Sequence, residues 1–237
     1  MKLLTWNISL TNPSFSAPDD WDTSLNVFEI HRIMEDEDPD IILLQEMPKA
    51  NFAKRFVDYD FTPPVTSHSG WLSSFVRKGV QLTNFYGKEY TSKVEVITNE
   101  GSFFLISCHL VPYKQNASLR LSQLQNIVSD LPADATLIIA GDMNMREDET
   151  KSVLEVLSVE DAFQLVGSKE DKFTWNSRVN KYANKGFEYT ARYDRVFVRG
   201  FGVKAFGLIG DKQVSENTGH FISDHYGITV ELELSAN

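Results

Sequence analysis

The strongest constraint on the fold is a short apolar run, residues 137–140, that leads directly into Gly141, Asp142 and Asn144. A short apolar run bounded by glycine is typical of a strand buried in a domain core. Such a strand places Asp142 and Asn144 at its carboxyl end, where α/β enzymes gather their catalytic groups. Gly-Asp-x-Asn is also a good turn sequence, so this stretch alone leaves a turn and a catalytic loop equally open.

Extended and helical patterns alternate along the rest of the chain. The apolar stripes predict helices over 23–36, 49–59, 116–131 and 149–157, with Thr23 or Ser24 capping the first and Asp148 capping the last. Runs of β-type composition predict strands over 2–9, 40–47, 70–77, 80–88, 92–99, 102–110, 191–199 and 222–234. Polar composition predicts loops over 12–22, 169–186 and 211–221.

This order of elements predicts one domain over residues 1–237, because no linker, repeat or low-complexity segment interrupts it. Long hairpin runs alternate with helices that lie between two-strand units. We therefore expect an α/β (α+β) sandwich of two mainly antiparallel mixed sheets, packed face to face, with helices outside.

Composition excludes some classes of function. A net charge of −10 argues against broad electrostatic capture of nucleic acid, although carboxylates that hold a cation would form a local positive centre. One cysteine, Cys108, excludes an internal disulfide and a cysteine zinc cluster and favours a reducing compartment. Neither a signal peptide nor a membrane-spanning run is present. We expect an intracellular protein of the nucleus or cytoplasm with no membrane partner.

Polar side chains stand at the ends of six core-like strands: Asn7, Glu46, His109, Asp142 with Asn144, Asp194, and Asp224 with His225. Each has an ordinary structural explanation, such as a turn cap, a helix start, a core histidine or a salt bridge. Unpaired charge at a buried strand end is costly, so six such groups need one another or an ion. Together they favour a functional site.

The residue types at these ends favour metal-assisted phosphoryl chemistry. An oxygen-rich set without thiolate suits Mg²⁺, with Mn²⁺ as a substitute, and Glu46 is the best single ligand. Asp142 could activate the attacking water, and His225 could act as an acid or base or stabilise phosphate oxygens. A Ser-His-Asp hydrolase is less favoured because the chain contains no G-x-S-x-G elbow.

A series of short motifs in the same order resembles the endonuclease/exonuclease/phosphatase superfamily. These motifs are TWN at 5–7, LQE at 44–46, S-x-H-L at 107–110, GDMN at 141–144, YDRVF at 193–197 and SDHYG at 223–227. The resemblance implies a four-layered α/β sandwich that hydrolyses phosphodiesters or phosphomonoesters with Mg²⁺.

Further motifs resemble the subfamily that releases tyrosine left by a topoisomerase on a DNA 5′-phosphate. They are R-x-x-Q-L at 120–124, the extension of GDMN to GDMNMRED, F-T-W at 173–175 and R-Y-D-R-V-F at 192–197. The resemblance implies a phosphodiesterase that leaves a 5′-phosphate, with DNA 5′ ends, single-stranded or frayed, as its partner. It also implies a monomer without an obligate protein partner and a bare catalytic domain.

The resemblance also implies roles for individual residues. Glu46 would hold the metal with Asp224 as a second metal residue, Asp142 would position the water, and Asp194 would orient His225 against the phosphorane. Asn7 and Asn144 would contact the phosphate or its water shell, and Asp224 and His109 would complete the phosphate pocket. The expected contacts to substrate are Arg146, Trp175, Tyr193, Lys114 and Arg120.

The sequence departs from the subfamily pattern in three places. Ser9 stands where many members have an acid, which puts a second metal contact in doubt. Pro112 and Lys114 stand where the phosphate clamp has Ser and Arg, and lysine cannot make the bidentate phosphate contact of arginine. Other activities of the superfamily therefore remain alternatives: an apurinic or general nuclease, an exonuclease, a deadenylase or a small-molecule phosphatase. An inactive scaffold is the non-enzyme alternative.

Overall fold

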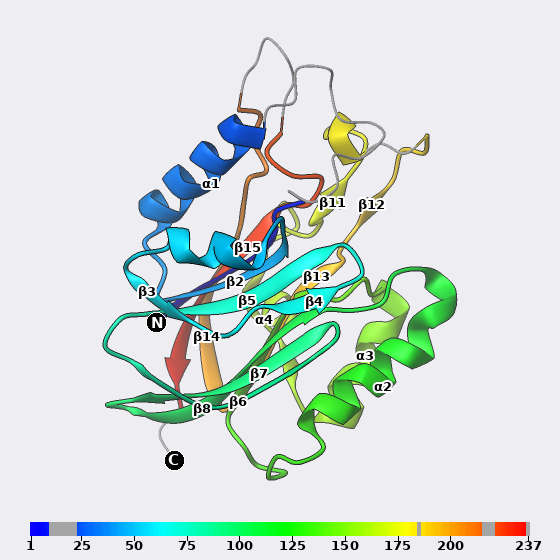
Figure 1. Cartoon of the computed structure of the whole chain (residues 1–237). Helices are drawn as coiled ribbons and strands as arrows, with labels where there is room; N and C mark the ends of the chain where they lie inside the picture. The colour runs from blue at the N-terminus through cyan, green and yellow to red at the C-terminus, as the bar shows by residue number, and fades with distance from the viewer. Residues whose placement is uncertain (10–22, 184–185, 215–220, 236–237) are drawn as a thin grey trace.

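Two β-sheets packed face to face form the centre of the computed structural model, which describes residues 1–9, 23–183, 186–214 and 221–235 (Figure 1). The first sheet pairs β1 and β2 in parallel and its other neighbouring strands antiparallel. Its order is β14 (Phe201–Ile209), β15 (Gly227–Leu234), β1 (Lys2–Asn7), β2 (Ile41–Met47), β5 (Gly70–Arg77) and β3 (Tyr59–Phe61), with β4 (Val65–Ser67) also paired to β5.

The second sheet likewise contains one parallel pair, β8 and β9, among antiparallel neighbours. Its order is β10 (Glu160–Asp161), β13 (Asp194–Arg199), β9 (Leu137–Asp142), β8 (Gly101–His109), β7 (Thr91–Thr98) and β6 (Gln81–Lys88). A small separate hairpin joins β11 (Trp175–Asn176) to β12 (Thr190–Ala191).

Helices cover the outer face of each sheet, so the molecule has four layers. The α1 helix (Thr23–Glu37) and the 3₁₀ helix η1 (Ala50–Arg55) pack on the first sheet, and α2 (Ala117–Val128) and α3 (Glu147–Leu157) pack on the second. The remaining short helices are η2 (Lys114–Asn116), α4 (Ala162–Val166) and η3 (Lys181–Ala183). Among the described residues, no helix is long and apolar enough to cross a membrane.

Three apolar clusters hold these layers together. One lies between the sheets and includes Leu3, Leu43 and Ile138; the second joins α1 and η1 to the first sheet, and the third joins α2 and α3 to the second. Complete burial of a Leu, Ile or Val side chain contributes about 1.5–3 kcal/mol. The apolar runs predicted as strands are therefore the main source of stability and also the frame of the site.

The predicted fold class is confirmed, and most predicted elements are present within three residues of their expected bounds. In place of the helix expected over residues 49–59, the structure has the short η1 and the first residue of β3. The α3 helix starts earlier than expected, because Glu149 accepts the backbone N–H of Arg146 at 2.9 Å, so Arg146 rather than Asp148 is the N-cap. The predicted loop 12–22 and part of 211–221 lie outside the described residues, as do the side chains of Thr23 and Ser24.

In the C-terminal region one predicted strand starts at the wrong residue and one strand was not predicted. The last strand begins at Gly227 rather than 222, because the backbone N–H of His225 is held by the Ser223 hydroxyl in a turn before the strand. The strand β14 was not predicted, since Gly202, Lys204 and Gly207 interrupt its apolar alternation. Its extended form comes from a long antiparallel pairing with β15.

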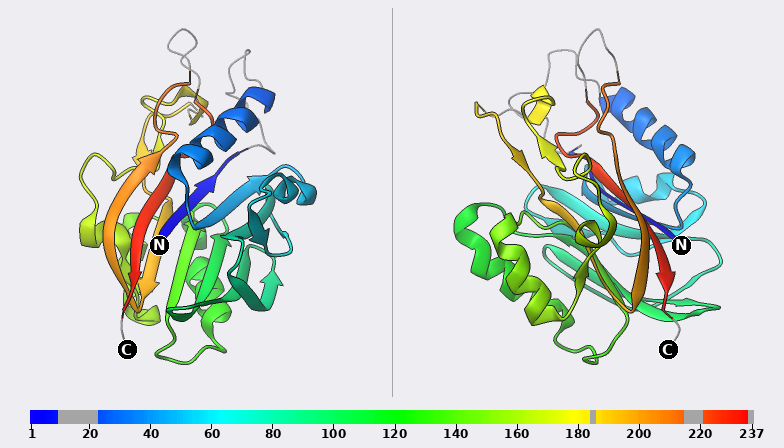
Figure 2. Two further views of the ribbon diagram at one scale, coloured as in Figure 1. Left: turned by 90° about the vertical axis from the view of Figure 1, so that its left-hand side faces the viewer. Right: turned by 180° about the vertical axis from the view of Figure 1, so that it is seen from behind.

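The sheets carry the predicted polar residues to one end of the sandwich. The strands β1, β2, β8 and β9 end there, whereas β13 and β15, which run antiparallel to their neighbours, begin there. Figure 2 shows the β11–β12 hairpin projecting from this end, away from the C-terminus. Strand ends and strand starts therefore meet around one point.

Candidate active site

Strand pairing within each sheet brings the polar residues of neighbouring strands side by side. Asn7 pairs with Gln45, the neighbour of Glu46, while Asp142 lies between His109 on β8 and Asp194 on β13. All of these side chains except that of Glu46 are at least nine-tenths buried. The site is therefore built on buried strand ends.

Two backbone features aim the carboxylates. Gly141 has a φ of 136°, and a Cβ there would lie 2.1 Å from the carbonyl oxygen of Cys108, so only glycine allows β8 and β9 to approach this closely. Glu46 has a φ of 55° at a register shift of β2 between Leu44 and Met47. Left-handed backbone is unfavourable for glutamate, and such strain gathers at functional sites.

Asp142 is the centre of the hydrogen-bond network. It accepts a hydrogen bond from Asn7 Nδ2 at 3.1 Å and one from the backbone N–H of Asn144 at 2.9 Å. Its Oδ2 lies 3.5 Å from His109 Nε2 and 3.8 Å from His225 Nε2. Burial opposes its charge, but the charge of His225 and the hydrogen bonds from Asn144 and Asn7 lower its pKa, so Asp142 is an ionised carboxylate.

His225 is held as an imidazolium. Its Nδ1 lies 2.8 Å from Asp194 Oδ2, and the backbone N–H groups of Tyr193 and Asp194 donate to Thr174 Oγ1 at 3.1 Å. Burial opposes the charge on the ring, yet Asp194 and Asp142 raise the pKa of His225 well above its ordinary value. The positively charged ring of His225 thus lies between two carboxylates, those of Asp194 and Asp142.

Glu46 and Asp224 form the acidic side of the site. Glu46 Oε1 accepts hydrogen bonds from Ser69 Oγ at 2.8 Å and from Asn7 Nδ2 at 3.2 Å. Burial, together with the charge of Asp224, raises the pKa of Glu46 to about 7. A divalent cation would relieve this repulsion, and the carboxylate donors are those that Mg²⁺ and Mn²⁺ prefer. These residues fit the expected metal.

The loop after β9 joins Asn144 and Arg146 to the site. Asn144 has a φ of 50°, which asparagine tolerates, and its Nδ2 donates to the carbonyl oxygen of Leu110 at 3.0 Å. The Arg146 guanidinium donates to the carbonyl oxygen of Asn144 at 2.7 Å and lies 4.6 Å from the centre of the Tyr193 ring. The sequence left a turn and a catalytic loop equally open for Gly141–Asn144. In the structure this segment is a tight loop whose polar groups lie inside the site.

Some predicted substrate contacts are placed differently. Arg120 is 1% exposed, pairs with Glu149 at 2.6 Å and donates to the carbonyl oxygens of Val111 and Tyr113. This buried network gives Arg120 a structural role in place of the expected substrate contact. Lys114 is exposed on η2, and its phosphate contact stays a prediction.

The two predicted stacking aromatics are buried. Trp175 is 4% exposed and meets the His225 ring edge-on at 5.1 Å, while Tyr193 is 7% exposed beneath Arg146. Each ring packs inside the protein, and stacking of a base on either ring stays a prediction. Tyr189, 38% exposed and stacked on Trp175, is the outward-facing aromatic.

Sequence reasoning missed the turn between β4 and β5. Ser67 Oγ lies 3.0 Å from His109 Nδ1, Ser69 donates to Glu46, and the His68 ring lies 4.2 Å from that of His109. Ser223 was also missed, although its hydroxyl donates to the carbonyl oxygen of Asn7 at 2.7 Å. The signal was available in Ser-His-Ser-Gly, since these residues immediately precede a predicted strand.

Comparison with known proteins gives matches along most of the chain. The model of the Endonuclease/Exonuclease/phosphatase family matches residues 4–225. Tyrosyl-DNA phosphodiesterase 2 of Danio rerio is 26% identical over 219 residues, which cover 80% of this chain and 57% of the relative. The Homo sapiens protein of the same name is 25% identical over 223 residues, covering 83% and 60%. The chain thus spans less than two thirds of these curated relatives.

A solved structure shows the same fold. Tyrosyl-DNA phosphodiesterase 2 of Danio rerio, complexed with a single-stranded DNA product, superposes with a TM-score of 0.80. The two chains are 21% identical, and the match covers 98% of each.

Proposed function

Since the chain belongs to the Endonuclease/Exonuclease/phosphatase family, we propose that it is a divalent-metal-dependent phosphodiesterase that removes 5′-phosphotyrosyl adducts from DNA ends and leaves a 5′-phosphate. The similarity to tyrosyl-DNA phosphodiesterase 2 supports this choice of substrate. The observation that carries the proposal is the position of His225 between the carboxylates of Asp194 and Asp142. Asn7 links this group to Glu46, because its Nδ2 donates hydrogen bonds to both Glu46 and Asp142.

The charges of these residues suit an in-line attack of water on a phosphodiester. Asp142, which is ionised, can accept the proton of an attacking water. His225, which is an imidazolium, can donate to a phosphate oxygen on which negative charge develops. Asp194 is a positioning residue, because it holds the His225 ring and its charge without reaching the substrate.

Glu46 and Asp224 would hold the metal, with Asn7 and Asn144 contacting the phosphate or its water shell. When bound, Mg²⁺ would neutralise charge on the phosphate oxygens. Mn²⁺ has the same preference for oxygen donors and would substitute for it.

The DNA would be a single-stranded or frayed 5′ end. A chain with a net charge of −10 does not attract a duplex broadly. Arg146 and Lys114 would offer local positive charge, and Tyr189 is an exposed ring stacked on Trp175. Base stacking on an aromatic ring is worth about 1–3 kcal/mol, so one ring would compensate for part of the missing basic surface. Such a substrate would place the chain inside the cell, in the nucleus or the cytoplasm.

The direct test is release of tyrosine from a 5′-phosphotyrosyl oligonucleotide in Mg²⁺, followed by mass spectrometry. We expect release by the wild-type chain and loss of activity in Glu46→Ala, with circular dichroism confirming that the variant is folded. Release no greater than that of Glu46→Ala would overturn the proposal. So would faster turnover of an abasic duplex, poly(A) or an inositol phosphate presented at the same concentration.

A further inference from the structure

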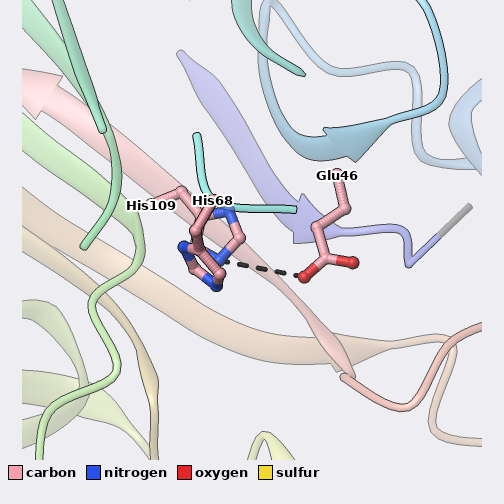
Figure 3. Close-up of side chains that lie close together, drawn as sticks. All are labelled: Glu46, His68 and His109. Carbon is pink, nitrogen blue, oxygen red and sulfur yellow. Dashed lines mark ion pairs between the residues drawn. The ribbon is translucent and has the colours of Figure 1, made fainter. Parts of the chain in front are cut away.

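Three potential metal ligands converge beside the proposed catalytic centre: Glu46, His68 and His109 (Figure 3). They come from the end of β2, the turn between β4 and β5, and the end of β8. One ligand atom of each lies within 4.8 Å of the others, and the His109 Nε2 to Glu46 Oε1 distance is 3.8 Å. Figure 3 shows the carboxylate of Glu46 facing the two imidazoles.

The orientation of His109 aims its Nε2 into this group. Ser67 Oγ lies 3.0 Å from His109 Nδ1 and fixes the direction of the ring. Nε2 faces Glu46 Oε1 at 3.8 Å and Asp142 Oδ2 at 3.5 Å. A neutral imidazole can offer its Nε2 lone pair to a cation that these two carboxylates also attract.

The turn between β4 and β5 supports the whole group with consecutive residues. Ser67 orients His109, Ser69 donates to Glu46 at 2.8 Å, and His68 between them contacts the edge of the His109 ring at 4.2 Å. Hydrogen bonds that fix the tautomer and direction of each ligand are the usual support of a metal site. The turn therefore holds Glu46 and His109 in position and supplies His68 beside them.

We propose that Glu46, His68 and His109 form a site for a divalent first-row transition ion of the zinc and cobalt class. Imidazole nitrogen favours such ions, whereas Mg²⁺ takes oxygen ligands. The inference deepens the proposed function only in that Glu46 is shared: with the added imidazole donors of His68 and His109, the metal position at Glu46 accepts Mg²⁺ but binds a transition ion more tightly.

The test is a titration of the metal-free chain with Co²⁺, followed by visible absorption, with the electron spin echo of bound Mn²⁺ as a second readout. We expect nitrogen coupling to Mn²⁺ in the wild-type chain and weaker coupling in His68→Gln. We also expect a loss of at least about tenfold in Co²⁺ affinity in His68→Gln and His109→Gln, and about tenfold in Ser67→Ala, which keeps all three ligands but frees His109.

The matched control is His31→Gln, because His31 stacks on Phe56 in the outer layer and its substitution should leave Co²⁺ affinity unchanged. His68 lies on an exposed turn, so His68→Gln tests the site even if His109→Gln does not fold. Wild-type Co²⁺ affinity in His68→Gln, or Mn²⁺ bound without nitrogen coupling, would overturn the inference. The titration contains no DNA, so nitrogen ligation without tyrosine release would refute the proposed function alone.

Discussion

Two buried histidines flank Asp142, and the regions around them give the same side chain opposite charge. His225, before β15, lies 3.8 Å from Asp142 Oδ2, and His109, at the end of β8, lies 3.5 Å from the same atom. They are 6% and 1% exposed. Burial and Asp142 are thus nearly common to both rings.

The difference lies in the atom on the far side of each ring. Nδ1 of His225 meets the carboxylate of Asp194 at 2.8 Å, whereas Nδ1 of His109 meets the neutral hydroxyl of Ser67 at 3.0 Å. Burial and the neighbouring His68 lower the pKa of His109 to about 3, although Asp142 opposes the shift. Without a carboxylate behind the ring, desolvation prevails. One region therefore supplies a cation and the other a lone pair.

The largest effect should come from removing the cation. We expect His225→Gln to lower kcat for tyrosine release about 10²–10⁴-fold, because the group that donates to the developing phosphorane is lost. Metal affinity should remain nearly unchanged, since Glu46 stays in place. Stopped assays and Mn²⁺ calorimetry would measure the two effects. A large loss of metal binding would show that His225 belongs to the metal site.

Asp194→Asn should make the two histidines alike. Without the carboxylate at 2.8 Å, the pKa of His225 should fall, and kcat at neutral pH should fall about 10²-fold with partial recovery at lower pH. A pH–rate profile would show the change, and the exposed Asp148→Asn is the matched control. An unaltered profile in Asp194→Asn would mean that this carboxylate does not set the charge of His225.

The neutral state of His109 should change how the free energy of unfolding of the metal-free chain depends on pH in acid. The pKa of His109 is about 3 in the folded chain, and its ordinary value is 6.5. On acidification the unfolded chain binds the proton of His109 at a higher pH than the folded chain does. The contribution of neutral His109 to the free energy of unfolding is therefore complete above pH 6.5 and is lost as the pH falls toward 3. The loss at pH 5 is about 2 kcal/mol. Urea unfolding with a chelator should show a shallower acid decline in His109→Gln; an equally steep decline would contradict a neutral His109.

The smallest effect concerns the hydroxyl behind the neutral ring. Ser67→Ala removes the partner of His109 Nδ1, and the lost hydrogen bond should lower the free energy of unfolding by about 1 kcal/mol. Urea unfolding at neutral pH would measure it. Thr66→Ala, on the preceding exposed residue of β4, serves as the control. Equal stability of the two variants would show that Ser67 does not hold the ring.

Local pattern was sufficient for the frame of the molecule. The runs around Leu43 and Ile138 are apolar in every residue, which predicts buried strands wherever they lie. A polar group at the end of such a run, as at Glu46 or Asp142, indicates a site because an unpaired charge there is costly. Strand β14 was not predicted, since its extended form depends on β15 rather than on its own alternation.

Partners remote in sequence decided the rest. Arg120 and Trp175 lie in motifs that suggested substrate contact. Inside the protein, Arg120 pairs with Glu149 and Trp175 packs against the His225 ring. His68 gains its place in the site only because the turn between β4 and β5 brings it against His109.

The sequence by itself therefore determined the strands of the core and which polar residues end them, because apolar periodicity and the cost of buried charge act along the chain. Only the tertiary structure decided which of those residues face one another and with what charge. A pKa depends on the groups within a few ångströms of it, and Asp194 and Ser67 reach the two histidines only through folding.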